Sequence, residues 1–100
     1  MNDVCLHLLA APEIEEQLLD QLLLSTVSKT FTSAKAASHG GHIQGLDPRE
    51  QVLGRGDAVL IQVLLDAEDA RRLIEELRRR LPSAGVRFWL TPLLGQGQIG

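Results

Sequence analysis

Apolar residues occur along the chain in short runs and in helical stripes, and this spacing predicts its regular elements. Short runs that stop at Pro, Gly or polar turns predict strands at 4–9, 30–36, 58–65 and 86–91. Apolar residues repeated every three or four positions predict helices at 12–24, with Pro12 in the first turn, and at 66–81, with Asp66 as N-cap. The order β-α-β-β-α-β is typical of the ferredoxin-like fold. We expect an α+β domain whose four-stranded antiparallel sheet carries two helices on one face.

Each predicted helix has an apolar stripe that should pack on the sheet. In the first helix the stripe consists of Ile14, Leu18, Leu19, Leu22 and Leu23. In the second helix it consists of Ala70, Leu73, Ile74, Leu77 and Leu81. The second helix also carries the arginines Arg71, Arg72, Arg78, Arg79 and Arg80. Glutamates three or four residues away predict that these arginines form a solvated face.

The predicted strands carry apolar residues on both faces of the sheet. One face of 58–65 has Gln62 as its single polar residue, and the opposite face has none. In the first strand both faces are mainly apolar, with Cys5, His7 and Leu9 on one side. Two helices cover only one face of such a sheet. Because a monomer of this size avoids a large exposed apolar patch, we expect copies of the chain to cover the other face.

Composition and charge narrow the class of protein. The chain has 100 residues, which fits one domain over 1–100. A formal net charge of -3 and 3% aromatic residues argue against a nucleic-acid binder. A single cysteine, Cys5, makes no internal disulfide and favours a reducing, cytoplasmic location. Asp3 stands where a signal peptide carries basic residues, and no apolar run is long enough to cross a membrane, so we expect no membrane insertion.

The segment 38–57 differs from the rest of the chain. It holds five of the nine glycines, together with His39 and His42. A loop of this length in so small a domain is usually functional or mobile, and Asp47 with Glu50 predicts one capped helical turn within it. Its apolar residues Leu46, Val52 and Leu53 are candidates for contact with a partner protein.

Two pairs of residues have metal-ligand chemistry. Imidazoles such as those of His39 and His42 suit a divalent metal such as Cu, Zn or Ni, but two ligands need completion, here from other copies of the chain. The other interpretation makes them surface histidines beside Gly40 and Gly41 in a turn. Cys5 and His7 share one face of a strand and form a second candidate pair, or are ordinary core residues.

Arg55 and Arg87 are candidates for binding an anionic ligand. Arg55 lies between Gly54 and Gly56, whose backbone N–H groups could join it around an anion, although the same residues also suit a tight turn. Arg87 precedes Phe88 in the last predicted strand, where it is either a cleft residue or a surface cation. The sequence has no Gly-x-Ser-x-Gly motif and no candidate carboxylate pair in a cleft, so we expect no catalytic site and no enzyme.

Several segments resemble nitrogen-regulatory PII proteins. Residues 32–36 running into 38–42 are similar to the second PII strand and the glycine-rich base of the PII T-loop, and 58–77 and 88–92 to later PII elements. The resemblance to this PII-like superfamily implies a homotrimer whose sheets face inward, with a ligand in the cleft between subunits. Its ligand-binding residues would be His39, Gly40, Gly41, His42, Arg55 and Arg87. The segment 38–57 would then signal to a partner protein.

More narrowly, the His-Gly-rich turn at 39–42, the stretch 47–56 and the predicted strand with Trp89 resemble a small PII-like family of unknown function. Members of that family are often encoded near heavy-metal efflux systems. The connection 82–85 lacks the Gly-Asp-Gly-Lys phosphate loop of PII proteins, and the chain has no tyrosine for PII-type modification. Adenine-nucleotide binding would therefore need a modified pocket. Two hypotheses follow: a non-catalytic regulatory or sensor homotrimer, and a metal-binding accessory protein whose partner is a metal-efflux component.

Overall fold

The computed structural model describes residues 2–25, 27, 30–39 and 55–100. Its elements are β1 (Asp3–Ala10), the 3-10 turn η1 (Pro12–Ile14), α1 (Glu15–Leu24), β2 (Phe31–His39), β3 (Arg55–Asp66), α3 (Ala67–Arg80) and β4 (Arg87–Pro92). The predicted β-α-β-β-α-β order and the ferredoxin-like fold are confirmed. The predicted helical turn at 47–50 lies outside the described residues.

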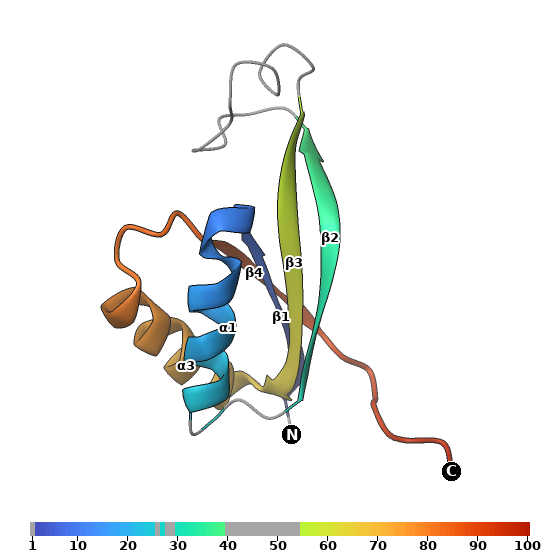
Figure 1. Ribbon diagram of the computed structural model, residues 1–100. Helices are drawn as coiled ribbons and strands as arrows, with labels where there is room; N and C mark the ends of the chain where they lie inside the picture. Colours follow the sequence, from blue (N-terminus) through green and yellow to red (C-terminus); the bar gives the residue numbers. More distant parts are fainter. Residues whose placement is uncertain (1, 26, 28–29, 40–54) are drawn as a thin grey trace.

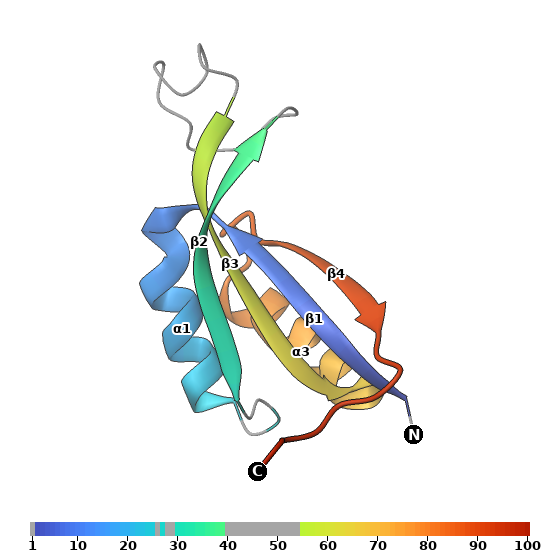
Figure 2. The same cartoon turned by 90° about the vertical axis from the view of Figure 1, so that its right-hand side faces the viewer.

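The strands form one antiparallel sheet in the order β2-β3-β1-β4. Both helices cover the same face of this sheet, and the opposite face, turned toward the viewer in Figure 2, carries no helix among the described elements. We refer to the two sides as the helix face and the open face. The central strands β3 and β1 contribute side chains to both.

The core lies between the helix face and the two helices. Leu6 and Leu8 of β1 pair with Val63 and Ile61 of β3, and all four side chains are buried. They pack with Leu18 and Leu22 of α1 and with Ala70, Leu73 and Ile74 of α3. Burying each large aliphatic side chain contributes about 1.5–3 kcal/mol, so this layer supplies most of the free energy that holds the helices on the sheet.

The first helix departs from prediction at both of its ends. Residues 12–14 form a 3-10 turn rather than α-helix, because the Ile14 N–H donates to the Ala11 carbonyl three residues earlier, at 3.0 Å. Leu23 is 72% exposed, so its assignment to the packing stripe was wrong. A residue directly after buried Leu22 is rotated by about 100° around the helix, away from the sheet.

The second long helix, α3, follows the prediction closely. The Asp66 carboxylate accepts a hydrogen bond from the Asp69 N–H at 2.8 Å and so caps the helix. The predicted arginine face is exposed and carries ion pairs spaced by three residues, such as Arg71 with Glu68 at 2.7 Å. The Arg71 guanidinium holds the pKa of the Glu68 carboxyl below its usual range.

The hairpin formed by β2 and β3 is longer than predicted. The segment 38–57 is not all loop, since Ser38 pairs with Gly56 and His39 pairs with Arg55. β1 pairs with β3 only as far as Ala10 opposite Val59, so the last pairs of β2 and β3 extend past the sheet as a two-stranded ribbon (Figure 1). The prediction failed here because backbone pairing needs no apolar alternation, and this stretch is rich in Ala, Ser and Gly.

Candidate functional site

The centre of the open face is a hydrogen-bonded cluster around His7. Gln62 Nε2 lies 3.3 Å from His7 Nδ1, and the Thr91 hydroxyl oxygen lies 3.0 Å from His7 Nε2, so both ring nitrogens have a hydrogen-bond partner. The Trp89 ring stacks on the imidazole, with centroids 5.2 Å apart and planes 5° from parallel. The register explains this grouping, because His7 lies directly opposite both Gln62 and Trp89.

Apolar side chains surround this cluster. Leu9 and Leu60 are half-buried neighbours across β1 and β3, while Leu64 and Trp89 are 43% and 42% exposed. The predicted second apolar face is therefore present within one chain. The described tail after β4 leaves on this same side, away from the helices (Figure 1).

Cys5 is the other candidate metal ligand on the open face. As predicted, it shares this face with His7, but its side chain is buried between Leu64 and Thr91. Desolvation by burial raises the pKa of its thiol, although a hydrogen bond with the Val63 backbone acts in the opposite direction. Both His7 nitrogens already have partners, and no three acidic, His or Cys side chains among the described residues could hold a metal ion. The geometry favours the interpretation of Cys5 and His7 as ordinary sheet residues.

The remaining predicted site residues lie at two places. His39 is the exposed last residue of β2, at the end of the ribbon and opposite Arg55, the first residue of β3. Arg87 is the exposed first residue of β4, on the open face opposite Leu9. β2 and β4 are opposite edges of the sheet, so one chain does not bring His39 and Arg87 together. Gly40, Gly41 and His42 lie outside the described residues.

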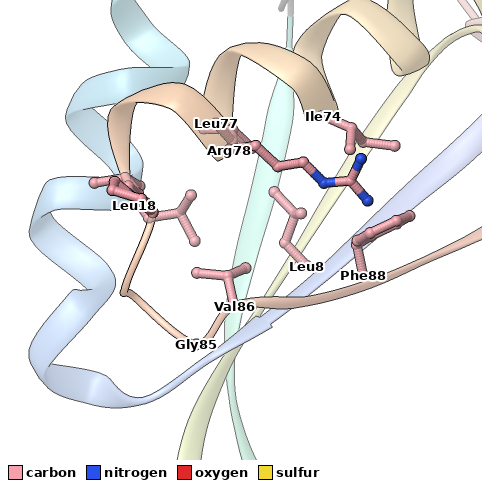
Figure 3. Close-up of a pocket in the computed structure, with 10 residues that line it drawn as sticks. Leu8, Leu18, Ile74, Leu77, Arg78, Gly85, Val86 and Phe88 are labelled. Carbon is pink, nitrogen blue, oxygen red and sulfur yellow. The ribbon is translucent and has the colours of Figure 1, made fainter.

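A groove between α3 and β4 was not predicted. Its cavity measures about 370 Å³, and Leu8, Leu18, Leu77, Arg78, Val86 and Phe88 are among its lining residues (Figure 3). Arg78 was assigned to the solvated helix face, yet it follows Ile74 by four positions and so borders the apolar stripe. That spacing is the sequence signal that could have placed Arg78 at the groove.

The whole chain matches one family model. Residues 1–100 fit the model of DUF3240, described as a protein family of unknown function. The chain belongs to the DUF3240 family. No curated protein matches it. None of the described residues belongs to a helix long and apolar enough to span a membrane.

Solved structures of similar fold cover nearly the whole DUF3240 chain. The DUF3240 protein of Shewanella baltica OS155 is 15% identical, with a TM-score of 0.81, over 100% of this chain and 99% of that one. The PII-like protein CPII of Thiomonas intermedia K12, solved with ADP, AMP and bicarbonate, is 15% identical, with a TM-score of 0.69 over 98% of each chain. CutA of Archaeoglobus fulgidus, a divalent cation tolerance protein, is 10% identical, with a TM-score of 0.68 over 98% of this chain and 89% of that one. These likenesses confirm the PII-like fold.

Proposed function

We propose that this protein is a non-catalytic regulatory or sensor homotrimer of the cytoplasm. A small ligand binds in the cleft between two subunits, and the segment 38–57 passes the signal to a partner protein. The observation that carries the proposal is the division of the candidate residues between opposite sheet edges, Arg87 on β4 and His39 on β2. Such a site is complete only when β4 of one subunit lies beside β2 of the next.

The open face supports assembly of the subunits. Leu64 and Trp89 are large apolar side chains that water contacts in a single chain. Covering them with a second and third copy removes that apolar surface from water, the main driving force of association. The PII-like fold and the PII resemblance of the sequence favour three copies with their sheets inward.

Arg87 is positioned for an anionic ligand in the proposed cleft. It lies on the row of Leu9 and Leu60, at the end of the sheet from which the ribbon extends. Its exposed guanidinium offers N–H donors that match a phosphate or carboxylate. The connection 82–85 has no lysine, so in this proposal Arg87 takes over the charge neutralisation of an adenine nucleotide, together with Arg55 and the glycines near His39.

The ribbon connects the proposed cleft to a partner protein. Its last pairs, including Ser38 with Gly56, extend beyond β1 and continue into 40–54. A ligand that binds one conformation of the segment 38–57 more tightly than another increases the population of that conformation. The surface that the segment offers to the partner protein changes as a result.

A thermal-shift titration tests the ligand and its site. ADP, AMP and ATP should each be added to the wild type and to Arg87→Gln, with Arg79→Gln as a control on the helix side. We expect a nucleotide to raise Tm in the wild type and in Arg79→Gln, and Arg87→Gln to lose most of the increase. An equal increase in all three proteins, or none in the wild type, would contradict nucleotide binding at the cleft.

The second candidate function is metal binding, by an accessory protein whose partner is a component of a heavy-metal efflux system. The exposed position of His39 at the ribbon end favours it, because homotrimeric assembly would supply three such imidazoles. His39 with His42 would bind Cu, Zn or Ni. If one of these metals raises Tm in the wild type but not in the double variant His39→Ala/His42→Ala, this function replaces nucleotide sensing. A metal effect that survives in the double variant would exclude the site.

A further inference from the structure

The groove between α3 and β4 lies on the helix side of the sheet, apart from the proposed subunit cleft. Its floor is formed by Leu8 and Leu18, which are fully buried. Its walls come from Leu77 on α3, from Val86 just before β4 and from Phe88 in β4, and Figure 3 shows these side chains around one space. The Phe88 ring is 42% exposed, so the apolar wall continues to the surface. At about 370 Å³, the cavity lies within the range of small-molecule sites.

Arg78 places a positive charge at the mouth of this groove. Its Nη1 donates to Glu75 Oε1 at 3.0 Å, and its guanidinium carbon lies 5.6 Å from the centre of the Phe88 ring. The ion pair and the ring together hold the guanidinium over the groove (Figure 3). A guanidinium has five N–H donors, and within the described part of the chain Glu75 is the hydrogen-bond acceptor found for Arg78.

The surrounding charge is also positive. Arg79 and Arg80 follow Arg78 at the end of α3, are exposed, and have no ion pair among the described residues. The last turn of the helix therefore carries an excess of positive charge beside the groove. An anionic group is attracted to this end, whereas an apolar body is favoured further in.

We propose that the groove binds a small carboxylic acid with an alkyl or aryl body. The body occupies the space between Leu77, Val86 and Phe88, where it replaces water. The carboxylate stays at the mouth and accepts hydrogen bonds from the Arg78 N–H donors that Glu75 does not use. Neither Arg87 nor His39, the residues that define the proposed subunit cleft, lines this groove.

The chain's own C-terminal tail does not supply this occupant. Leu94 and Ile99 are fully exposed apolar residues, but the tail begins at the far end of β4 from Phe88. Asp3 holds it there, accepting hydrogen bonds from the Leu93 N–H at 3.0 Å and from Gln96 Nε2 at 3.2 Å. The tail then continues on the open-face side (Figure 1).

Octanoate is a suitable probe, with 1-octanol as its uncharged counterpart. Calorimetric titration should show saturable binding of one octanoate per chain, and the NMR signals of Leu77, Val86 and Phe88 should shift. Octanol should bind at least about tenfold more weakly, because it lacks the charge-assisted hydrogen bonds. Absence of saturable octanoate binding, or equal affinity for octanol, would overturn the proposal.

Two matched variants locate the carboxylate. Arg78→Gln should weaken octanoate binding about tenfold or more, while Arg72→Gln, an exposed arginine nearer the start of α3 that does not line the groove, should change it less than about twofold. Equal losses in both variants would show a general charge effect and overturn the assignment of Arg78. A synthetic peptide of residues 93–100 is the competing occupant, and displacement of octanoate by an equal concentration of it would assign the groove to the tail of another copy.

Discussion

The two faces of the sheet are built from similar residues but differ in how much of their side-chain surface is buried in a single chain. On the helix face, Leu6, Ile61 and Val63 have no exposed surface, because α1 and α3 cover them. On the open face, Leu64 and Trp89 keep about two-fifths of their surface exposed. On the edge strand β4 the helix-face residues Phe88 and Leu90 are exposed to a similar extent, so the contrast belongs to the central strands β1 and β3. There one chain completes a single core on the helix face and leaves apolar side chains of the open face in contact with water.

The polar residues of the open face are consistent with burial by such a surface. His7, Gln62 and Thr91 satisfy one another, and Trp89 covers one side of the imidazole. A second layer placed over this face would leave none of these hydrogen bonds broken. The open face therefore combines apolar residues with a polar group that is already satisfied, as an interface core requires.

The largest effect is expected on the helix face. Ile61→Ala removes fully buried methylene and methyl groups and leaves a cavity, so it should lower the free energy of unfolding by about 2–5 kcal/mol. Leu24→Ala, on an exposed side chain of α1, should change it by less than about 0.5 kcal/mol. Urea unfolding followed by circular dichroism measures both, and equal effects would contradict the division between core and surface.

A change on the open face should affect assembly rather than folding. Leu64→Asp places an unpaired charge on the proposed interface, which should weaken association at least about tenfold, equivalent to about 1.4 kcal/mol. Sedimentation velocity should show smaller species, while circular dichroism stays that of a folded chain. Glu13→Gln, on the exposed helix side, is the control and should sediment like the wild type. Unchanged assembly of Leu64→Asp would show that the open face is not the interface.

Loss of the N-terminal cap of α3 should have an intermediate effect, which is limited to the free energy of unfolding and leaves assembly unchanged. Asp66→Ala removes the hydrogen bond to the Asp69 N–H and should cost about 1 kcal/mol of unfolding free energy without altering assembly. Asp66→Asn keeps a capping oxygen and should restore most of that loss. If the Asn variant is as unstable as the Ala variant, the cap is not the cause.

The smallest effect concerns the thiol on the open face. Burial raises the pKa of Cys5, so at a given pH less of it is thiolate than in an exposed cysteine. Iodoacetamide should therefore label native Cys5 more slowly than the same residue in urea-unfolded chain, and the contrast should persist from pH 7 to 9. Equal rates in both states would contradict the burial of Cys5.

Sequence reasoning predicted the fold where local signals and tertiary packing agreed. The alternation in β3 placed Ile61 and Leu64 on opposite faces, and Asp66 was identified as a cap. Sequence reasoning failed where the structure depends on interactions that the spacing of apolar residues does not indicate. The ribbon pairs such as His39 with Arg55 depend on backbone hydrogen bonds, and the exposure of Leu23 depends on how wide a face of α1 the sheet covers.

The candidate sites were predicted less completely than the fold. His39 and Arg87 were identified by residue type, but their separation to opposite edges follows from strand order, which no local pattern specifies. The groove was missed because it forms between residues distant in sequence, Leu8, Arg78 and Phe88. Such a cavity depends on how α3 lies against the edge strand, a property of packing rather than of any one segment.

Light scattering coupled to size-exclusion chromatography tests the central claim most directly. If copies of the chain cover the open face as proposed, the wild-type protein at micromolar concentration should have three times the 10.9 kDa mass of one chain. A single species at the mass of one chain would contradict the account, because Leu64 and Trp89 would then remain exposed in the working molecule.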